Sequence, residues 1–284
     1  MKRFGKFLFV LIAILVLGAC GKQEESASGD QAAKDKVRVA VVGSSEKEIW
    51  EFVADKAKAE GIDLEVTELT DYNQPNQALA NGDVDINAFQ HYAFLKQWNE
   101  DHNEDLTPIG LTFITPLYIF SDKVDDLKDL PEGGQVIIPQ ETSIQGRALL
   151  ALQTAGVLKL RDGGSTLSQV SDVVENPKNI ELVEVESAQA PRLVKDVDAA
   201  VVNGSFAEDA GMKIEDNIFT DADHLDQIPN DRYNLIVARK EDQNNPTLQK
   251  IVQLYQAQDV ADKMNEVSPG QYYPVWGQKV DFIP

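Results

Sequence analysis

The chain has 284 residues, with 47 acidic and 26 basic side chains and a formal net charge of −21 at pH 7. So acidic a surface disfavours nucleic acid and anionic lipid headgroups as direct partners, because both carry dense negative charge. Cys20 is the single cysteine, so the chain cannot form an internal disulfide and its fold must be held by an apolar core.

The N-terminal residues have the pattern of a bacterial export signal. A short basic stretch precedes an unbroken apolar run over 7–17, which is shorter than the roughly 20 apolar residues of a membrane-spanning helix. Gly18 and Ala19 stand directly before Cys20, as in a lipobox. We therefore expect 1–19 to be a lipoprotein signal peptide and Cys20 to be lipidated. The alternative is an ordinary signal peptide followed by a chance cysteine.

The next segment predicts a tether. Residues 21–35 are small or polar and include no large apolar side chain, so they cannot contribute to a core. We expect 20–35 to comprise the lipidated cysteine and a flexible tether. The roughly 250 residues that follow suit two lobes of about 100 to 150 residues each.

The segment from 37 to 67 predicts a strand, a helix and a second strand. The run 37–42 is apolar and β-branched and ends at a Gly-Ser-Ser turn, while apolar and polar residues alternate over 62–67. Between them, Ser45 and Glu48 form a capping-box pattern at the start of a helical period. This βαβ order predicts a parallel sheet.

A dense group of aromatic side chains follows the third predicted strand, at 84–88. Phe89, His91 and Tyr92 come directly after it, and ligands in open α/β sheets bind beyond the carboxyl ends of strands. With Tyr72 from an earlier loop, they would supply an apolar, polarisable wall that suits a thioether. The alternative is that the aromatic side chains only cover the first turn of the next helix.

The rest of the chain repeats the α/β pattern after a crossing segment. The apolar run 111–120 contains Pro116, which suits a segment that passes between lobes better than a central strand. We expect strands at 136–138, 181–186, 199–202 and 234–238, and helices at 143–156 and 246–264. A Val-Asp pair enters the strand at 84 and again at 197, which predicts two lobes that present equivalent edges to one cleft.

The chemistry written in the sequence favours binding over catalysis. It has no phosphate-binding glycine pattern, no nucleophile elbow and no short metal-ligand spacing between its histidines, so we expect no catalytic residues, cofactor or metal ion. Arg147 falls in the first turn of a predicted helix, where its guanidinium could pair with a carboxylate beside helix N–H groups. Asn203 ends a buried strand and could bind the same ligand. The alternatives are an exposed arginine and a turn-forming asparagine.

Four blocks of sequence occur in a specific order: DYNQPNQAL at 71–79, NAFQH at 87–91, QGRALL at 145–150 and YNLIV at 233–237. Together they resemble the MetQ-type methionine-binding lipoproteins of ABC importers, the NlpA family. The resemblance implies an α/β, two-lobed type II periplasmic-binding-protein fold with the ligand in the interlobe cleft. Lobe 1 would comprise 36–115 plus 229–284, and lobe 2 would comprise 116–228.

The resemblance also implies a set of ligand-binding residues: Tyr72, Phe89, His91 and Tyr92 around the side chain, Arg147 at the carboxylate, and Asn203 and Asn234 at the amino-acid head group. Two departures from the family pattern lie near the presumed cleft. Residues 92–95 stand where the family often has Pro-Tyr-Leu after one residue, and residues 231–233 replace a Pro-Tyr-Val step. They leave L-methionine, D-methionine and a methionine-containing dipeptide open as ligands.

The sequence as a whole predicts a non-enzymatic binding lipoprotein that is anchored by lipid to the extracytoplasmic face of the cell membrane. Its partners would be methionine or a methionine dipeptide, and the permease and separate ATPase of an ABC importer, with no nucleic acid. The alternatives are a binder of another small amino acid or of a methionine-containing dipeptide, and a ligand-free surface adhesin lipoprotein. An enzyme on this fold is a third, less supported alternative.

Overall fold

A computed structural model describes residues 36–283 of the chain. The expected signal peptide over 1–19, the lipidation of Cys20 and the tether over 20–35 therefore lie outside the described residues. Within 36–283, no helix combines the length and apolar character that a bilayer crossing requires.

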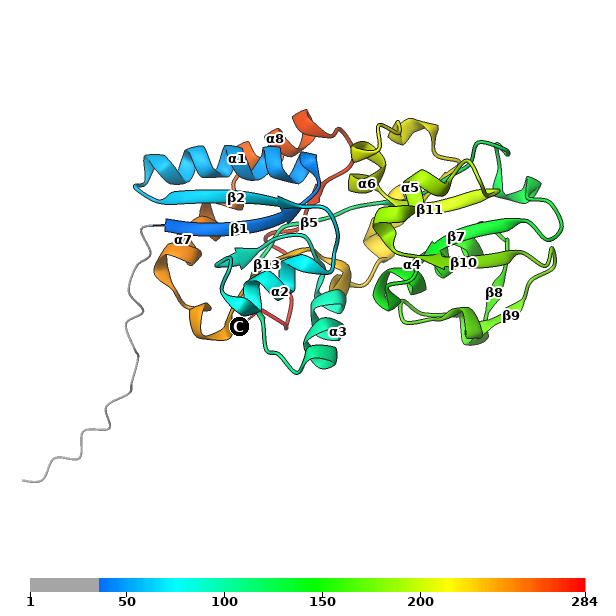
Figure 1. The fold of residues 1–284 in the computed structure, drawn as a ribbon, viewed down its shortest axis with the longest axis horizontal. Coiled ribbons are helices and arrows are strands. Elements are labelled where there is room, and N and C mark those ends of the chain that lie inside the picture. Colours follow the sequence, from blue (N-terminus) through cyan, green and yellow to red (C-terminus); the bar gives the residue numbers. More distant parts are fainter. Residues whose placement is uncertain (1–35, 284) are drawn as a thin grey trace, which may run out of the picture. The chain divides into compact units, whose positions relative to one another are not determined.

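The described chain is built on two five-stranded sheets, one in each of two lobes (Figure 1). The first sheet has the order β2-β1-β3-β13-β4. Its strands are β1 (Lys36–Val42), β2 (Asp63–Leu69), β3 (Ile86–Asn87), β4 (Thr107–Leu111) and β13 (Leu235–Ala238). The strands β1, β2 and β3 run parallel, as predicted, whereas β13 is antiparallel to both β3 and β4.

The second sheet has the order β10-β7-β11-β6-β12. Its strands are β6 (Leu117–Phe120), β7 (Gln135–Pro139), β10 (Glu181–Val185), β11 (Ala199–Asn203) and β12 (Phe219–Thr220). Again three strands, β10, β7 and β11, are parallel and β6 is antiparallel to its neighbours. Two small pairs complete the sheet structure, β5 (Phe113–Ile114) with β14 (Tyr273–Pro274) and β8 (Lys159–Leu160) with β9 (Val173–Glu175).

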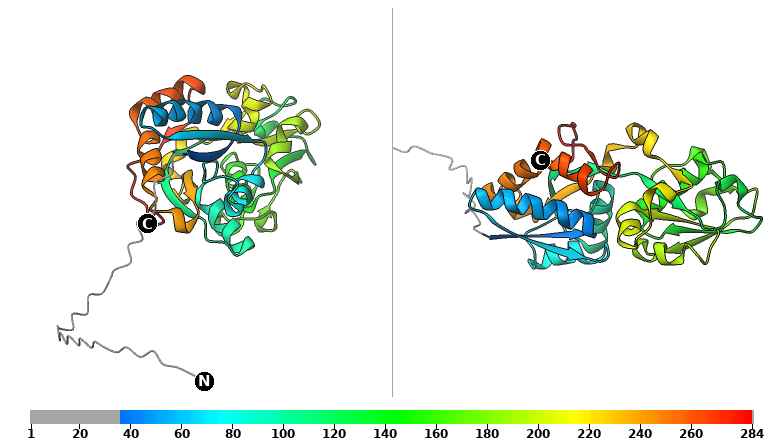
Figure 2. Two further views of the ribbon diagram at one scale, coloured as in Figure 1. Left: turned by 60° about the vertical axis from the view of Figure 1, so that its left-hand side comes forward. Right: turned by 90° about the horizontal axis from the view of Figure 1, so that it is seen from above.

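Eight α-helices lie within the described residues: α1 (Ser44–Ala59), α2 (Gln74–Asn81), α3 (Tyr92–His102), α4 (Thr142–Thr154), α5 (Ala190–Leu193), α6 (Gly204–Asp209), α7 (Pro246–Tyr255) and α8 (Gln258–Val267). Helices α1, α7 and α8 pack together over one face of the first sheet (Figure 2). Short 3₁₀ turns occur at Leu127–Asp129, Arg161–Gly163, Val170–Asp172, Ser187–Gln189, Ile214–Asp216, Ala222–Gln227, Asn230–Arg232 and Lys240–Asp242.

Two local predictions are wrong. The single helix predicted over 246–264 is broken between α7 and α8, where Ala257 is extended and forms the N-cap of α8. The capping box of Ser45 and Glu48 does not form, since Gly43 occupies the N-cap. Instead, the Ser45 hydroxyl donates to Glu208 of α6 at 2.8 Å, so this residue links the start of α1 to the other lobe.

The segment around Pro116 passes from the first sheet to the second, as predicted. The strand β4 before it belongs to the first sheet and β6 after it to the second. The chain returns between β12 and β13, over residues 221–234. These two crossings border the region between the lobes, which is where the candidate site lies.

The repeated Val-Asp pair marks an equivalent position in the two lobes. The main-chain N–H of Arg38 in β1 donates to Asp85 Oδ2 at 2.9 Å, and the N–H of Asp85 donates back to the Arg38 carbonyl at 2.9 Å. Asp198 makes the same two contacts with Gln135 of β7, at 2.8 Å and 2.9 Å. Each aspartate therefore fastens the start of the third parallel strand to the first.

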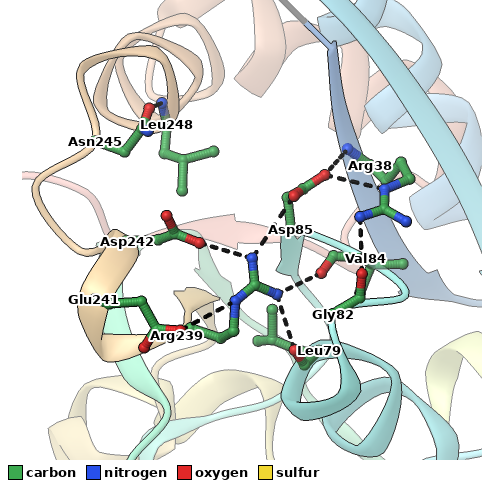
Figure 3. A network of polar contacts seen from close by, with 10 residues as sticks. All are labelled: Arg38, Leu79, Gly82, Val84, Asp85, Arg239, Glu241, Asp242, Asn245 and Leu248. Carbon is green, nitrogen blue, oxygen red and sulfur yellow. Dashed lines mark hydrogen bonds and ion pairs between the residues drawn. The ribbon is translucent and has the colours of Figure 1, made fainter. Parts of the chain in front are cut away.

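In the first lobe this fastening is extended by a buried ion network (Figure 3). Asp85 also accepts a hydrogen bond from Arg38 Nε at 3.1 Å and lies 3.7 Å from Arg239 Nη2. Arg239, just after β13, donates to the carbonyl oxygens of Leu79 and Val84 at 3.0 and 2.8 Å. The network fixes the loop that enters β3, and the chain leaves the opposite end of β3 at the candidate site.

Candidate functional site

A cavity lies between the lobes and is lined by segments that follow the carboxyl ends of strands in both sheets. Six of the seven predicted ligand residues line it: Tyr72, Phe89, His91, Arg147, Asn203 and Asn234. The cavity volume is about 50 Å³, counted as positions for the centre of a water-sized molecule. One water needs roughly 10–15 Å³ by this measure, so the space suits a small molecule rather than a polypeptide.

Tyr92 does not line this cavity, so we correct its predicted place in the site. His91 is the N-cap of α3 and Tyr92 is its first helical residue. The Tyr92 ring stacks on Phe282 of the C-terminal tail, with ring centroids 4.0 Å apart, and faces a separate surface depression. The alternative interpretation, in which this side chain covers the first turn of the helix, describes it better. Phe94, two residues further along α3, lines the cavity instead.

The apolar wall of the cavity is a cluster of aromatic rings. The Tyr72 ring lies 5.8 Å from Phe89 and 4.8 Å from Phe206, and Phe89 meets Phe94 edge-to-face at 5.7 Å. Burial raises the pKa of the Tyr72 hydroxyl far above its usual value, so the ring stays neutral. The wall is thus apolar and polarisable, as a thioether would require.

A buried amide network supports this wall from behind. The Nδ2 group of Asn76 donates to Gln90 at 2.8 Å, Asn87 Nδ2 donates to Asn76 at 2.8 Å, and Gln90 Nε2 donates to Asn87 at 3.0 Å. All three side chains are almost fully buried. Because buried polar groups that satisfy one another resist rearrangement, the network fixes the chain between β3 and α3.

His91 presents a neutral ring to the cavity. Its Nδ1 atom accepts a hydrogen bond from the N–H of Phe94 at 3.1 Å. Burial, followed by the positive charges of Arg232 and Arg147, holds the pKa of His91 well below its usual value. The neutral ring therefore carries its proton on Nε2 and can donate one hydrogen bond to a ligand.

Arg147 already has a carboxylate partner within the protein. Its Nε and Nη2 atoms donate to the two oxygens of Asp221 at 2.8 and 2.9 Å, and Nη2 also donates to the Thr115 carbonyl at 2.9 Å. Among the described residues, Nη1 makes no hydrogen bond. Arg147 lies in the second turn of α4 rather than the first, because the helix begins at Thr142. The Nη1 group of the guanidinium thus remains for a ligand.

Arg232 is a second guanidinium at the cavity that the sequence did not assign to the site. It is 1% exposed and donates to the carbonyl oxygens of Ser143 and Thr166 at 2.5 and 2.8 Å. Its Nε atom lies 3.5 Å from Asp231 Oδ1. Arg232 belongs to the returning crossing and its partners belong to the other lobe, so it ties the lobes together beside Arg147.

Asn203 and Asn234 reach the cavity from the two lobes. Asn203 ends β11 and precedes α6, and its buried Oδ1 atom has no hydrogen-bond partner within 36–283. The main chain of Asn234 pairs with Thr112 and Phe113 at 2.9 and 2.8 Å, which fixes the position of its side chain at the start of β13. Both amides are therefore held where a ligand head group could use them.

The cavity also contains residues for which the sequence analysis found no role, namely Asp221 next to it and Glu46, Arg232, Gln271 and Tyr272 in its lining. Glu46 lies in the first turn of α1, shortly beyond the carboxyl end of β1, a position that could have marked it as a site candidate. Asp221, Arg232, Gln271 and Tyr272 lie in the returning crossing and the C-terminal tail. The sequence there has no periodic apolar pattern from which their positions could be predicted. Within the described chain, no group of His, Cys, Asp and Glu residues is placed to hold a metal ion.

A cavity between two α/β lobes, each contributing the carboxyl ends of its strands, defines a protein of the periplasmic-binding type, which closes on a ligand by hinge motion. The NlpA lipoprotein family matches residues 37–276, and the chain belongs to this family. The predicted two-lobed fold is thereby confirmed.

Relatives of the chain are known from sequence and from solved structures. The chain is 36% identical over 270 residues to the D-methionine-binding lipoprotein MetQ of Yersinia pestis, which covers 94% of this chain and 95% of the relative. The substrate-binding protein of a methionine transporter from Streptococcus pneumoniae is 36% identical, with a TM-score of 0.79 over 86% of this chain and 97% of that one. A nutrient-binding protein from Burkholderia cenocepacia, solved bound to methionine, is also 36% identical, with a TM-score of 0.79 over 84% and 100%.

Proposed function

We propose that this chain is a substrate-binding lipoprotein that captures methionine between its lobes and delivers it to an ABC importer. The observation that carries the proposal is the interlobe cavity, whose lining combines the Arg147 guanidinium, two amides and an aromatic wall. Proteins that are similar over most of the chain include a D-methionine-binding lipoprotein and a nutrient-binding protein solved bound to methionine. We propose no catalytic role for the site.

The ligand's carboxylate would bind the free Nη1 group of Arg147, since a guanidinium and a carboxylate form strong charge-assisted hydrogen bonds. The amides of Asn203 and Asn234 would hold the head group, and the Nε2–H of His91 would donate one further hydrogen bond. The thioether would pack on the rings of Tyr72 and Phe89, which lie 5.8 Å apart. This geometry leaves D- and L-methionine as separate candidates.

The lobes and the anchor complete the proposal. We assign 36–115 with 229–284 to lobe 1 and 116–228 to lobe 2, which agrees with the strands of each sheet. Lipidation of Cys20 would hold the protein at the extracytoplasmic face of the cell membrane. The permease and the ATPase would be separate chains, and the closed lobes would present the surface that the permease recognises.

The first experiment is mass spectrometry of small molecules released by denaturing the purified protein from Gly21 onward. Binding of D-methionine, L-methionine and glycyl-methionine is then measured by calorimetry on the emptied protein. We expect stoichiometric methionine, or a methionine dipeptide, in the extract. An empty extract together with no thermal shift at millimolar methionine would contradict the proposal and favour the ligand-free adhesin. A Cys20→Ser variant should be released from the membrane fraction.

A further inference from the structure

Glu46 is a buried carboxylate in the cavity without a protein partner. It lies in the first turn of α1, is 7% exposed and lines the cavity. Its Oε2 atom accepts no hydrogen bond, and within 36–283 no lysine, arginine or histidine forms an ion pair with it. The other acidic residue near the start of this helix, Glu48, is exposed and pairs with Lys263 at 2.7 Å.

An unpaired buried carboxylate is unfavourable in the empty protein. Ionised groups that leave water without a partner lose far more solvation free energy than the start of a helix returns. Burial accordingly raises the pKa of Glu46 well above its usual value, and no positive charge of the cavity opposes this effect. Arg147 and Arg232 therefore do not compensate Glu46, and the missing charge has to come from elsewhere.

Other unpaired polar atoms belong to residues that line the same cavity. Gln271 is 1% exposed, and both atoms of its side-chain amide lack hydrogen-bond partners in the described chain. The Tyr272 hydroxyl and Asn203 Oδ1 are also buried and unpaired. A Cβ atom on Gly204 would lie 1.8 Å from Gln271 Nε2, so glycine at this position leaves the space that the amide occupies.

The titratable groups that share electrostatic interactions with Glu46 are acidic, namely phenols and carboxylates. Burial raises the pKa of the Tyr72, Tyr255 and Tyr272 hydroxyls, and the negative charge of Glu46 adds to this effect, as does that of Glu208 on Tyr272. Phenols and carboxylates supply no positive charge to this part of the cavity. The lining of the cavity thus combines unpaired oxygen acceptors with the guanidiniums of Arg147 and Arg232. Such a cavity is complementary to a ligand with separate anionic and cationic groups.

We propose that Glu46 is the acceptor for a primary ammonium group of the ligand, with Gln271 Oε1 and Asn203 Oδ1 as further acceptors. The inference rests on the proposed function and makes a free amine a condition for binding. The ammonium has two possible sources, the α-amino group of methionine itself or the N-terminus of a dipeptide that ends in methionine. The shared chemistry is an ammonium ion beside a carboxylate that is otherwise unpaired.

The test compares two ligand pairs that differ only in the ammonium group. Methionine is paired with 4-(methylthio)butanoate, and glycyl-methionine with N-acetylmethionine. Calorimetry gives the affinity of each compound for the wild-type protein and for Glu46→Gln, which keeps the shape of the side chain and removes its charge. Glu48→Gln, the same change at the exposed position on the same helix, is the control.

For the wild type we expect the amine-bearing member of one pair to bind about ten- to a hundredfold more tightly than its partner. In Glu46→Gln most of that preference should disappear, while Glu48→Gln retains it. Loss of preference in the first pair assigns the ammonium to methionine, and loss in the second pair assigns it to a dipeptide. Thermal unfolding of the ligand-free variant should occur at the wild-type temperature or above, since the substitution removes an unpaired charge.

An unchanged preference in Glu46→Gln would overturn the inference and leave Glu46 as a neutral structural acid. That outcome is distinct from failure of the proposed function, in which the wild-type protein binds neither methionine nor glycyl-methionine. If Glu46→Gln unfolds, Glu46→Asp is measured instead. That variant keeps the charge and should retain the ammonium preference at reduced affinity, whereas equal weakening of both members of each pair would contradict the role.

Discussion

The pair of Arg147 and Asp221 allows the binding role and the structural role of one arginine to be separated. In Arg147→Ala, Asp221 keeps its buried carboxylate and loses its bidentate partner. Removing one member of a fully buried pair costs about 3–5 kcal/mol. Because the Arg147 and Asp221 side chains are 13% and 15% exposed, we expect a smaller loss of about 2–3 kcal/mol. For a chain of this size that lowers the Tm by about 5–10 °C.

The same variant should also lose methionine. A charge-assisted hydrogen bond contributes about 1.5–3 kcal/mol. Loss of at least one such bond should therefore weaken methionine binding by a factor of about ten to a hundred. A second substitution, Asp221→Asn in the Arg147→Ala background, removes the unpaired charge. It should restore more than half of the lost stability and none of the lost affinity.

Urea unfolding measures the stability of the single and double variants, and calorimetry measures their methionine affinity. Arg161→Ala is the control, because that arginine is exposed and only loosely paired with Asp172, at 3.8 Å. Wild-type affinity in Arg147→Ala would refute the carboxylate assignment. A double variant as unstable as the single one would refute the assignment of the stability loss to Asp221.

Three further predictions concern the strands, His91 and the corrected residue. Asp85→Ala should lower the free energy of unfolding by about 2–3 kcal/mol, and Asp198→Ala by less, because only Asp85 lies near two arginines; urea unfolding compares them. The pKa of His91 is depressed in the folded state. The contribution of its neutral ring to the free energy of unfolding is therefore complete above the unfolded-state pKa of about 6.5, and it is lost as the pH falls below that value. Relative to His91→Asn, which keeps an N-cap acceptor, wild-type urea midpoints should therefore decrease from pH 6.5 to pH 5. Calorimetry should find methionine affinity within about twofold of wild type in Tyr92→Ala, and a clear loss in Phe89→Ala; equal losses would restore Tyr92 to the site.

Much of the architecture follows from sequence periodicity. The parallel βαβ unit at 37–67, the crossing at Pro116 and the main strands of the second lobe were all predicted, because burial on a sheet or helix leaves a repeating apolar pattern. The capping box failed because Ser45 bonds to Glu208, a residue far away in sequence. Local sequence rules cannot detect a partner that only the tertiary fold supplies.

The residues of the candidate site likewise divide into those that the sequence pattern predicts and those that only the tertiary fold brings to the cavity. Phe89 and His91 follow a recognisable strand, so their position at the cavity could be expected from the chain alone. Asp221 and Arg232 lie in the irregular returning crossing. The contact of Arg232 with α4 depends on the packing of the two lobes, whereas Asp221 contacts α4 within the second lobe. Tyr92 was misplaced because one step along a helix turns a side chain by about 100°, from the cavity toward the C-terminal tail.

Asp85 and Asp198, at the start of β3 and β11, also fix the register of these strands. Each can reach its partner's main chain in only one register, and a shift by one residue would turn every following side chain to the opposite face of its sheet. The orientation of Phe89 beyond β3, and of Asn203 at the end of β11, is therefore set at the far end of each strand. Insertion or deletion of a single residue between either aspartate and the cavity would reorient the ligand-facing side chains without changing any residue of the cavity itself.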